Sequence, residues 1–237
     1  MRLILILIFL SFSTYADDGR YKNFCGRGFQ ISIQLVGQLP FTDYCSKVDT
    51  ERLKRVKEMR FFGLMEIRPE WIEGLEHLEE LDLAFWMIDE IYETPPGLLD
   101  NMINLKNLEL SLFPVEVYNR SNFKNLSKLE TLSLSSCEKP IKMDEDTLYD
   151  LKNLKVLNFE YLCLESLPKS LLKNNPKLET VIFRKMSLLE IPDNFFKGLK
   201  NLKKIDLSGN FFDSFDRERL GIPSSTEVEL RPDLVIK

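Results

Sequence analysis

The chain has 237 residues, of which 44% are hydrophobic and 29% charged, and its formal net charge is −5. This composition excludes a disordered chain, because there is enough apolar surface to build a core. The negative charge, with basic residues scattered among acids, argues against nucleic acid as a partner, since phosphates need clustered Lys and Arg.

The N-terminus has the features of a secretory signal peptide. Arg2 precedes an apolar run from Leu3 to Leu10, and Thr14-Tyr15-Ala16 supplies the small residues of a cleavage site. The run is shorter than the roughly 20 apolar residues that a membrane span needs. We therefore expect residues 1–16 to be removed and the mature protein to be secreted, with no membrane anchor.

Residues 17–50 are expected to form an N-terminal cap. The middle of this segment, Phe29 to Leu35, alternates apolar and polar residues as a half-buried strand does. Cys25 and Cys45 flank it, and secreted proteins fold where disulfides form. We therefore predict a Cys25–Cys45 disulfide that closes the cap. The sequence has no Cys-x-x-Cys motif and a single histidine, so we expect no metal site and no cofactor.

One pattern, L-x-x-L-x-L-x-x-z-x-Φ, recurs along the chain, where Φ is apolar and z is an inward position at the turn after the strand. Its seven copies begin at Val56, Leu78, Leu105, Leu129, Leu154, Leu178 and Leu202. The L-x-L portion predicts a short strand with two side chains inward and one outward. A single copy cannot bury its leucines, so stacked copies should form a parallel sheet over a shared core.

The stretch from Leu188 to Asn210, with Ile191-Pro192, Phe196 and Leu202, resembles a complete extracellular leucine-rich repeat. It is similar to the repeats of Toll-like receptor ectodomains and of small secreted leucine-rich-repeat proteins. The resemblance covers residues 51–220. It implies an α/β fold, a curved solenoid of about seven to eight repeats, with the parallel sheet on the concave face and short helical or irregular segments on the convex face.

Position z is normally Asn in this family, because its amide satisfies backbone groups at the turn. Only Asn210 keeps it, and the other copies have Leu64, Trp86, Phe113, Cys137, Leu162 and Met186. Cys137 is therefore expected to point inward, while Cys163 lies one position past z in the next copy. A free buried Cys137 and a Cys137–Cys163 disulfide are both open, and we slightly favour the free thiol because the two side chains should point in different directions.

Two sequons, Asn119-Arg120-Ser121 and Asn125-Leu126-Ser127, are candidate N-glycosylation sites. Both lie in the return segment between the third and fourth copies. Sugars at Asn119 and Asn125 would therefore leave the concave face free.

Residues 221–237 are expected to form a C-terminal cap. Val228 and Leu230 indicate an eighth, degenerate strand, and Glu227 and Glu229 would discourage another chain from pairing with its edge. A dimer surface is the alternative use of this end, so the oligomeric state is left open.

The strand register also assigns residues to the concave face. Acids are expected in the early copies and bases in the later ones, with large apolar groups among them. Aromatic and Arg side chains in an exposed row indicate a partner, although they could instead only pack against one another along the sheet. The expected partner-binding residues are Arg60, Phe62, Asp82, Phe85, Glu109, Asn158, Glu160, Tyr161, Arg184 and Lys185.

These residues, with the resemblance, predict a secreted protein-binding module that recognises a protein or microbial surface ligand, in keeping with the family's association with innate immunity. The alternatives are a secreted decoy or inhibitor that mimics a receptor ectodomain, and an extracellular-matrix adaptor. An enzyme is not expected, because the single histidine, His77, should face solvent on the convex side and not lie in a cleft beside a nucleophile.

Overall fold

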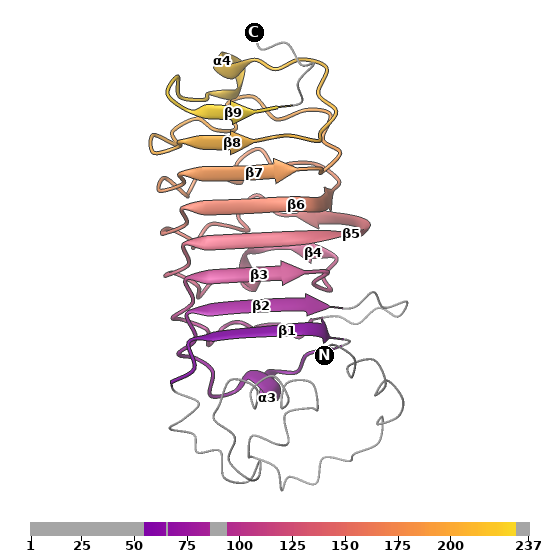
Figure 1. Cartoon of the computed structure of the whole chain (residues 1–237), viewed down its shortest axis with the longest axis vertical. Coiled ribbons are helices and arrows are strands. Elements are labelled where there is room, and N and C mark those ends of the chain that lie inside the picture. Colours follow the sequence, from indigo (N-terminus) through magenta and orange to yellow (C-terminus); the bar gives the residue numbers. More distant parts are fainter. Residues whose placement is uncertain (1–54, 65, 86–93, 231–237) are drawn as a thin grey trace, which may run out of the picture.

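The computed structural model describes residues 55–64, 66–85 and 94–230, which form a parallel β-solenoid of about seven turns with little helix. Eight strands stack in chain order in one continuous sheet, each parallel to the next (Figure 1). They are β1 (Glu58–Leu64), β2 (Glu80–Phe85), β3 (Asn107–Ser111), β5 (Thr131–Met143), β6 (Val156–Leu164), β7 (Thr180–Arg184), β8 (Lys204–Asp206) and β9 (Glu227–Glu229). The predicted leucine-rich-repeat architecture is confirmed.

The core is a single column of apolar side chains behind the sheet. Inward residues of successive strands pair in register, so that Leu81 lies beside Leu108 and Leu108 beside Leu132. All three are at most 2% exposed, as expected for the repeated leucines of the motif. Toward the C-terminal end phenylalanines fill the same column, and the rings of Phe159 and Phe183 stack with centroids 5.2 Å apart.

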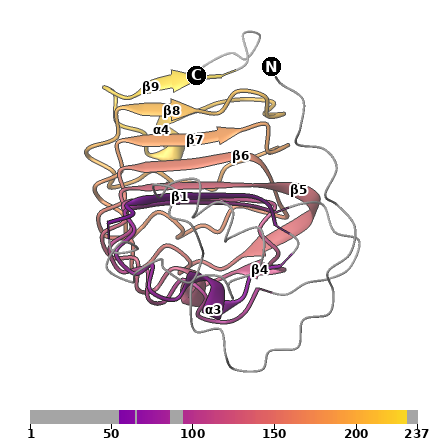
Figure 2. The same cartoon turned by 60° about the horizontal axis from the view of Figure 1, so that its bottom comes forward.

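The return segments close the other side of the solenoid with turns and short helices. They include α3 (Pro69–Ile72), the 3₁₀ helix η3 (Arg120–Asn122) and α4 (Arg217–Leu220). A short strand, β4 (Val117–Tyr118), pairs with the far end of β5 and makes a second region of parallel pairing that the repeat pattern did not predict (Figure 2). No helix among the described residues is long and apolar enough to cross a bilayer.

In five coils, that is, five turns of the solenoid, one residue just after the strand has a positive φ angle. It lies two positions after the second of the two inward residues of that strand. These residues are Gly63, Leu112, Tyr161, Lys185 and Gly209. The left-handed conformation adds one residue before the chain turns inward, and it is costly for the three that have a side chain. In the coils of β2 and β5 the equivalent residues are Phe85 and Ser136. Neither has a positive φ angle, and both side chains are buried. Those two coils therefore turn inward one residue earlier than the others.

A ladder of alternating charge runs along the edge of the sheet where the strands begin. Its members precede the strands in order: Lys57, Glu79, Lys106, Glu130, Lys155, Glu179 and Lys203. The carbonyl of each of the first six accepts the amide of the next member, which stacks the side chains at the spacing of neighbouring strands. Four ion pairs of 2.5 to 3.2 Å result, among them Lys106–Glu79 and Lys155–Glu130.

The C-terminal end of the solenoid is closed by β9 and α4. Glu227 and Glu229 continue the outward rows of the sheet on β9, and Val228 pairs with the inward Ile205. Helix α4 begins at the N-cap Asp216, whose carboxylate accepts the amide of Arg219 at 2.9 Å. Residues 231–237 of the expected cap lie outside the described residues.

Candidate binding surface

The surface that the sequence predicts to bind a partner is made by the outward residues of the eight strands, and we call it the sheet face. Two columns of outward side chains run across it in register. One contains Glu58, Glu80, Asn107, Thr131, Val156, Thr180, Lys204 and Glu227, and the other contains Arg60, Asp82, Glu109, Ser133, Asn158, Ile182, Asp206 and Glu229. Most of these side chains are half-buried or exposed, and Asp206 is buried.

The predicted basic cluster in the later strands is neutralised by acids of neighbouring coils. The Arg184 guanidinium lies 3.4 Å from the Asp206 carboxylate and 3.8 Å from that of Glu160. Lys204 pairs with Glu229 at 2.7 Å. The C-terminal half of the sheet face is therefore a network of matched charges and not a basic surface.

Tyr161 and Lys185 form a compact unit beside this network. The Lys185 Nζ donates to the Tyr161 hydroxyl at 2.6 Å and lies 4.5 Å from the centre of the same ring. This hydrogen bond is the main cause that raises the pKa of the Lys185 ammonium group. Tyr161 is 52% exposed, so the unit offers an aromatic edge and a fixed positive charge to a partner.

The N-terminal half of the sheet face is hollowed and acidic. A hollow of about 170 Å³ is lined by outward residues of β1, β2, β3 and β5, including Glu58, Glu80, Asp82 and Glu109. It is smaller than the roughly 300–1,000 Å³ typical of small-molecule pockets, so its shape suits a side chain of a larger partner. Arg60 is the basic residue that lines it, and it pairs with Glu58 at 2.7 Å.

Asp82 is the acid in this hollow whose ionisation the fold disfavours. Burial and the neighbouring Glu109 carboxylate raise its pKa from 3.8 to about 6, against the lowering effect of Arg60. No described residue hydrogen-bonds to the Asp82 carboxylate or lies within ion-pair distance of it. Part of the acidic charge in this half of the sheet face therefore has no ion-pair partner among the residues that the structure describes.

Phe85 is the predicted site residue that the structure moves away from the sheet face. It is only 4% exposed and packs edge-on against Phe113, with ring centroids 5.6 Å apart. Because Phe85 itself does not adopt the left-handed conformation, it pairs with the inward Leu64 instead of pointing outward. The expectation that Phe85 is exposed is wrong, whereas Phe62, at 56% exposure, is placed as predicted.

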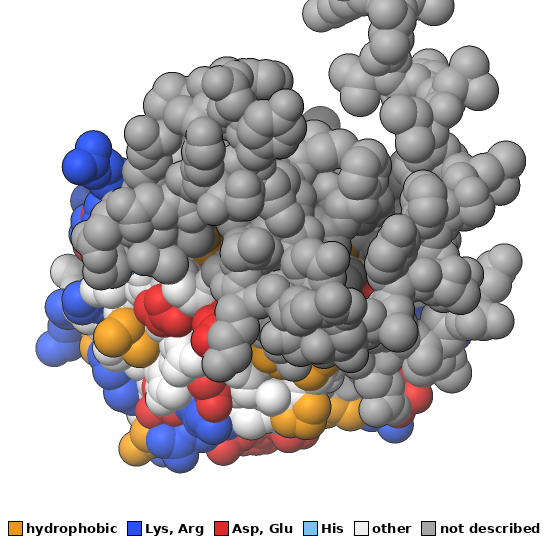
Figure 3. All heavy atoms as spheres, turned by 90° about the horizontal axis from the view of Figure 1, so that it is seen from below, with side chains coloured by type: hydrophobic (Ala, Val, Ile, Leu, Met, Phe, Trp, Pro, Cys, Tyr) orange, Lys and Arg blue, Asp and Glu red, His pale blue; other side chains and the backbone are white. Residues whose placement is uncertain are grey.

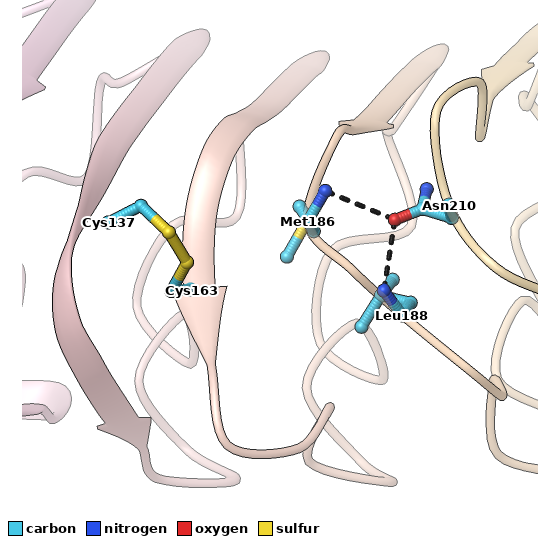
Figure 4. Close-up of a disulfide and its surroundings, with 5 residues drawn as sticks. All are labelled: Cys137, Cys163, Met186, Leu188 and Asn210. Carbon is cyan, nitrogen blue, oxygen red and sulfur yellow. Dashed lines mark hydrogen bonds between the residues drawn. A yellow bond between two sulfur atoms is a disulfide. The ribbon is translucent and has the colours of Figure 1, made fainter.

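Cys137 and Cys163 are joined in a disulfide between neighbouring coils (Figure 4). The preference for a free, buried Cys137 is wrong, and the side chain is exposed. The reason is the same early turn, because Ser136 and not Cys137 pairs with the inward Leu162. This shift brings Cys137 level with Cys163, with Cα atoms 4.8 Å apart.

The two sequons lie on the return side of the solenoid, away from the sheet face. Asn119 is the N-cap of η3, and its side-chain oxygen accepts from the amide and hydroxyl of Ser121 at 2.9 and 2.6 Å. Asn125 is exposed, and its amide donates to the carbonyl of Asp100 at 3.0 Å. The signal segment and the Cys25–Cys45 pair lie outside the described residues.

The site contains more acids than the sequence predicted. Glu58 and Glu80 line the hollow, and Asp206 and Glu229 neutralise the later bases, yet none was among the expected binding residues. Their outward register was visible in the motif. Their pairing was not, because it depends on side-chain conformations across neighbouring coils.

No protein-family model matches the chain. It is 29% identical over 154 residues to Toll-like receptor 7 of Mus musculus, covering 62% of this chain and 14% of the receptor. It is 26% identical over 183 residues to the volume-regulated anion channel subunit LRRC8E of Xenopus laevis, covering 66% of this chain and 22% of the subunit. The chain therefore spans less than a quarter of the length of either relative.

Solved structures share the fold. An internalin, inlF of Listeria monocytogenes, superposes with a TM-score of 0.56 at 22% identity, covering 83% of this chain and 53% of that chain. A chain of the Toll–Spätzle complex of Drosophila superposes with a TM-score of 0.55 at 23% identity, covering 68% and 20%. Fold and repeats together define a leucine-rich-repeat protein. It is distantly similar to Toll-like receptor ectodomains, internalins and the leucine-rich-repeat domains of LRRC8 proteins.

Proposed function

We propose that this chain is a secreted binding module, not an enzyme, that recognises a protein or microbial surface ligand on its sheet face and serves in innate immune recognition. The observation that carries the proposal is the sheet face itself, where exposed Phe62 and Tyr161 stand among charged side chains that no described residue covers. Aromatic groups in such a setting are typical of protein-binding hot spots. The likeness to a chain of the Toll–Spätzle complex, a molecular hub in Drosophila development and innate immunity, supports a protein ligand.

The charge of the sheet face supports a protein partner over nucleic acid. Acids outnumber bases in its outward columns, whereas binding to phosphates requires clustered Lys and Arg. Among the described residues, no group of three His, Cys, Asp or Glu side chains is arranged to hold a metal ion.

Capture from the native extracellular fluid tests the proposal. The bait is the mature protein, and the test variant replaces Phe62, Glu109 and Tyr161 with Ala, because all three are exposed on the sheet face. The matched control replaces three exposed apolar residues that lie outside the sheet face, and these are Ile103, Tyr149 and Leu189. Equal folding of all three proteins is checked by circular dichroism.

A partner retained by the wild type and the control but lost by the test variant would support recognition on the sheet face. Loss in the control alone would move the site to the return side and contradict the proposal. Capture of collagen or matrix glycans would favour a matrix adaptor, and capture of a known receptor's own ligand would favour a decoy.

We also propose that Cys25 and Cys45 are bonded and that Asn119 and Asn125 carry glycans. Both modifications fit secretion, and the exposed Cys137–Cys163 disulfide supports an oxidising compartment. Peptide mapping without reduction, before and after enzymatic removal of N-glycans, tests both. A free thiol at Cys25, or sequon peptides of unmodified mass from the secreted protein, would contradict the respective assignment.

A further inference from the structure

Three rows of outward residues that pair in register across the sheet face carry a negative excess. They contain eight acids, Glu58, Glu80, Asp82, Glu109, Glu160, Asp206, Glu227 and Glu229, and three bases, Arg60, Arg184 and Lys204. Their net charge is −5, which equals the formal charge of all 237 residues. The rest of the sequence contains as many Lys and Arg as Asp and Glu. In Figure 3, Lys and Arg side chains lie among Asp and Glu on the part of the surface that is not drawn in grey.

Among the described residues, the acids that lack a matching base lie on β1, β2 and β3. Four of the eight acids belong to these strands, and they face a single base, Arg60. In the later strands, by contrast, Glu160, Asp206 and Glu229 are all within 4 Å of a Lys or Arg. The imbalance is therefore local.

The shape of the surface coincides with the charge. The next outward row along the strands has small side chains, because Ala84, Ser111 and Ser135 pair in register there. Ser133, which lines the hollow, is also small. Small side chains leave the sheet floor open, so the acids border a depression and not a ridge. Phe62 begins the same row as Ala84 and is exposed, which places an apolar wall at the β1 end.

We propose that this acidic hollow is the docking site for a cationic segment of the protein partner, in which a Lys or Arg side chain enters the hollow and reaches Asp82 and Glu109. The inference rests on the proposed function and adds the chemistry of the ligand to it. A cation placed there removes the repulsion between two carboxylates that the fold holds near each other. Phe62 supplies apolar contact to the stem of the entering side chain.

The site also predicts a dependence on pH. The groups that face Asp82 from the neighbouring strands are Glu109, which raises its pKa, and Arg60, which lowers it. Because the pKa of Asp82 is about 6, the carboxyl is largely protonated at pH 5 and ionised at pH 7. Binding of a cationic segment should therefore be weaker at pH 5.

Fluorescence anisotropy with the full oxidised protein tests the inference. The probe is a fluorescein-labelled peptide of eight lysines, and a peptide of eight glutamates is its negative control. The test variant is Glu80→Gln, Asp82→Asn, Glu109→Gln. The matched control is Glu116→Gln, Glu145→Gln, Glu190→Gln, which makes the same change in net charge at exposed positions outside the strands. Circular dichroism verifies folding, and Asp82→Asn alone serves as a minimally perturbed second variant.

We expect the wild type to bind the lysine peptide at low salt, the test variant to bind it about tenfold more weakly, and the control to differ by less than about twofold. Binding by wild type should weaken from pH 7 to pH 5, and Asp82→Asn should remove most of that change. Equal losses in both triple variants would show attraction by net charge alone and overturn the inference. So would an absence of binding, or a wild-type dimer that the test variant disperses, since a second copy would then occupy the hollow. A partner captured through the sheet face but indifferent to the acid substitutions would leave the proposed function standing while overturning this assignment.

Discussion

Replacing Asn210 should lower the free energy of unfolding more than expected for a side chain of its size. Its side chain is 3% exposed and makes four hydrogen bonds to backbone groups of two coils. Its oxygen accepts from the amides of Met186 and Leu188, both at 3.1 Å (Figure 4), and its nitrogen donates to the carbonyls of Phe183 and Leu207 at 2.6 and 2.9 Å.

Asn210→Ala should lower the free energy of unfolding by about 3–5 kcal/mol. Each buried backbone group left without a partner costs about 1–3 kcal/mol, but water entry and relaxation of the turn recover part of the sum over four groups. The expected loss lies near the upper limit of ordinary single substitutions. The unbonded groups are in the last coils, so the damage should be concentrated there.

Urea denaturation followed by circular dichroism gives the free energy. Because repeat arrays can unfold in parts, amide hydrogen exchange across β7 and β8 should accompany it. Asn107→Ala is the control, since its half-buried amide makes one hydrogen bond, to Glu80 at 3.1 Å, and should cost less than about 1 kcal/mol. If Asn210→Ala cost no more than Asn107→Ala, or if exchange increased equally in β2, the reasoning would be refuted.

Four further substitutions test other features. Asp82→Asn should raise the free energy of unfolding at pH 7 by about 1 kcal/mol, after allowance for solvent screening, and should change it little at pH 4. Burial raises the pKa of Asp82 from 3.8 to about 6, so the folded state retains a proton that the unfolded chain loses between these values, and wild-type stability falls as pH rises through that window. Equal urea curves for the two proteins at pH 7 would contradict this. Tyr118→Phe should raise the free energy of unfolding by about 1 kcal/mol, because the fully buried hydroxyl has no hydrogen-bond partner among the described residues, and a lower melting temperature would be the opposite result. Replacing Cys137 and Cys163 with Ser should cost about 3 kcal/mol, since the disulfide closes the chain across 26 residues, and urea midpoints under non-reducing conditions measure the loss. Glu130→Lys should cost up to about 1 kcal/mol at low salt and less at high salt, because it places three lysines in a row, and a cost that is independent of salt would argue against the ladder.

The core could be predicted from the sequence because each inward position is determined locally. Alternation with period two places Leu81 and Leu83 inward on their strand, and the constant spacing of the copies brings Leu108 beside Leu81. Neither step requires knowledge of the rest of the chain. The same holds for Asn210, whose amide chemistry matched the turn that the motif implied.

The turns after the strands could not be predicted in the same way. Phe85 and Cys137 were misplaced because a coil can turn inward with or without a left-handed residue, and that choice depends on the path of the neighbouring coils. Leu112 and Tyr161 adopt the left-handed conformation although nothing in their side chains favours it. Tertiary packing decided these positions against local preference.

The charge ladder repeats every two coils, whereas the leucine motif repeats in every coil. Lys and Glu alternate from Lys57 to Lys203, so coils with the same sign recur at every second position. Loss of the single coil that carries Glu130 would bring Lys106 against Lys155, whereas loss of two adjacent coils would restore an attractive contact. Lengthening or shortening the array by protein engineering, or by genetic exchange within it, should therefore be tolerated in even steps and penalised in odd ones.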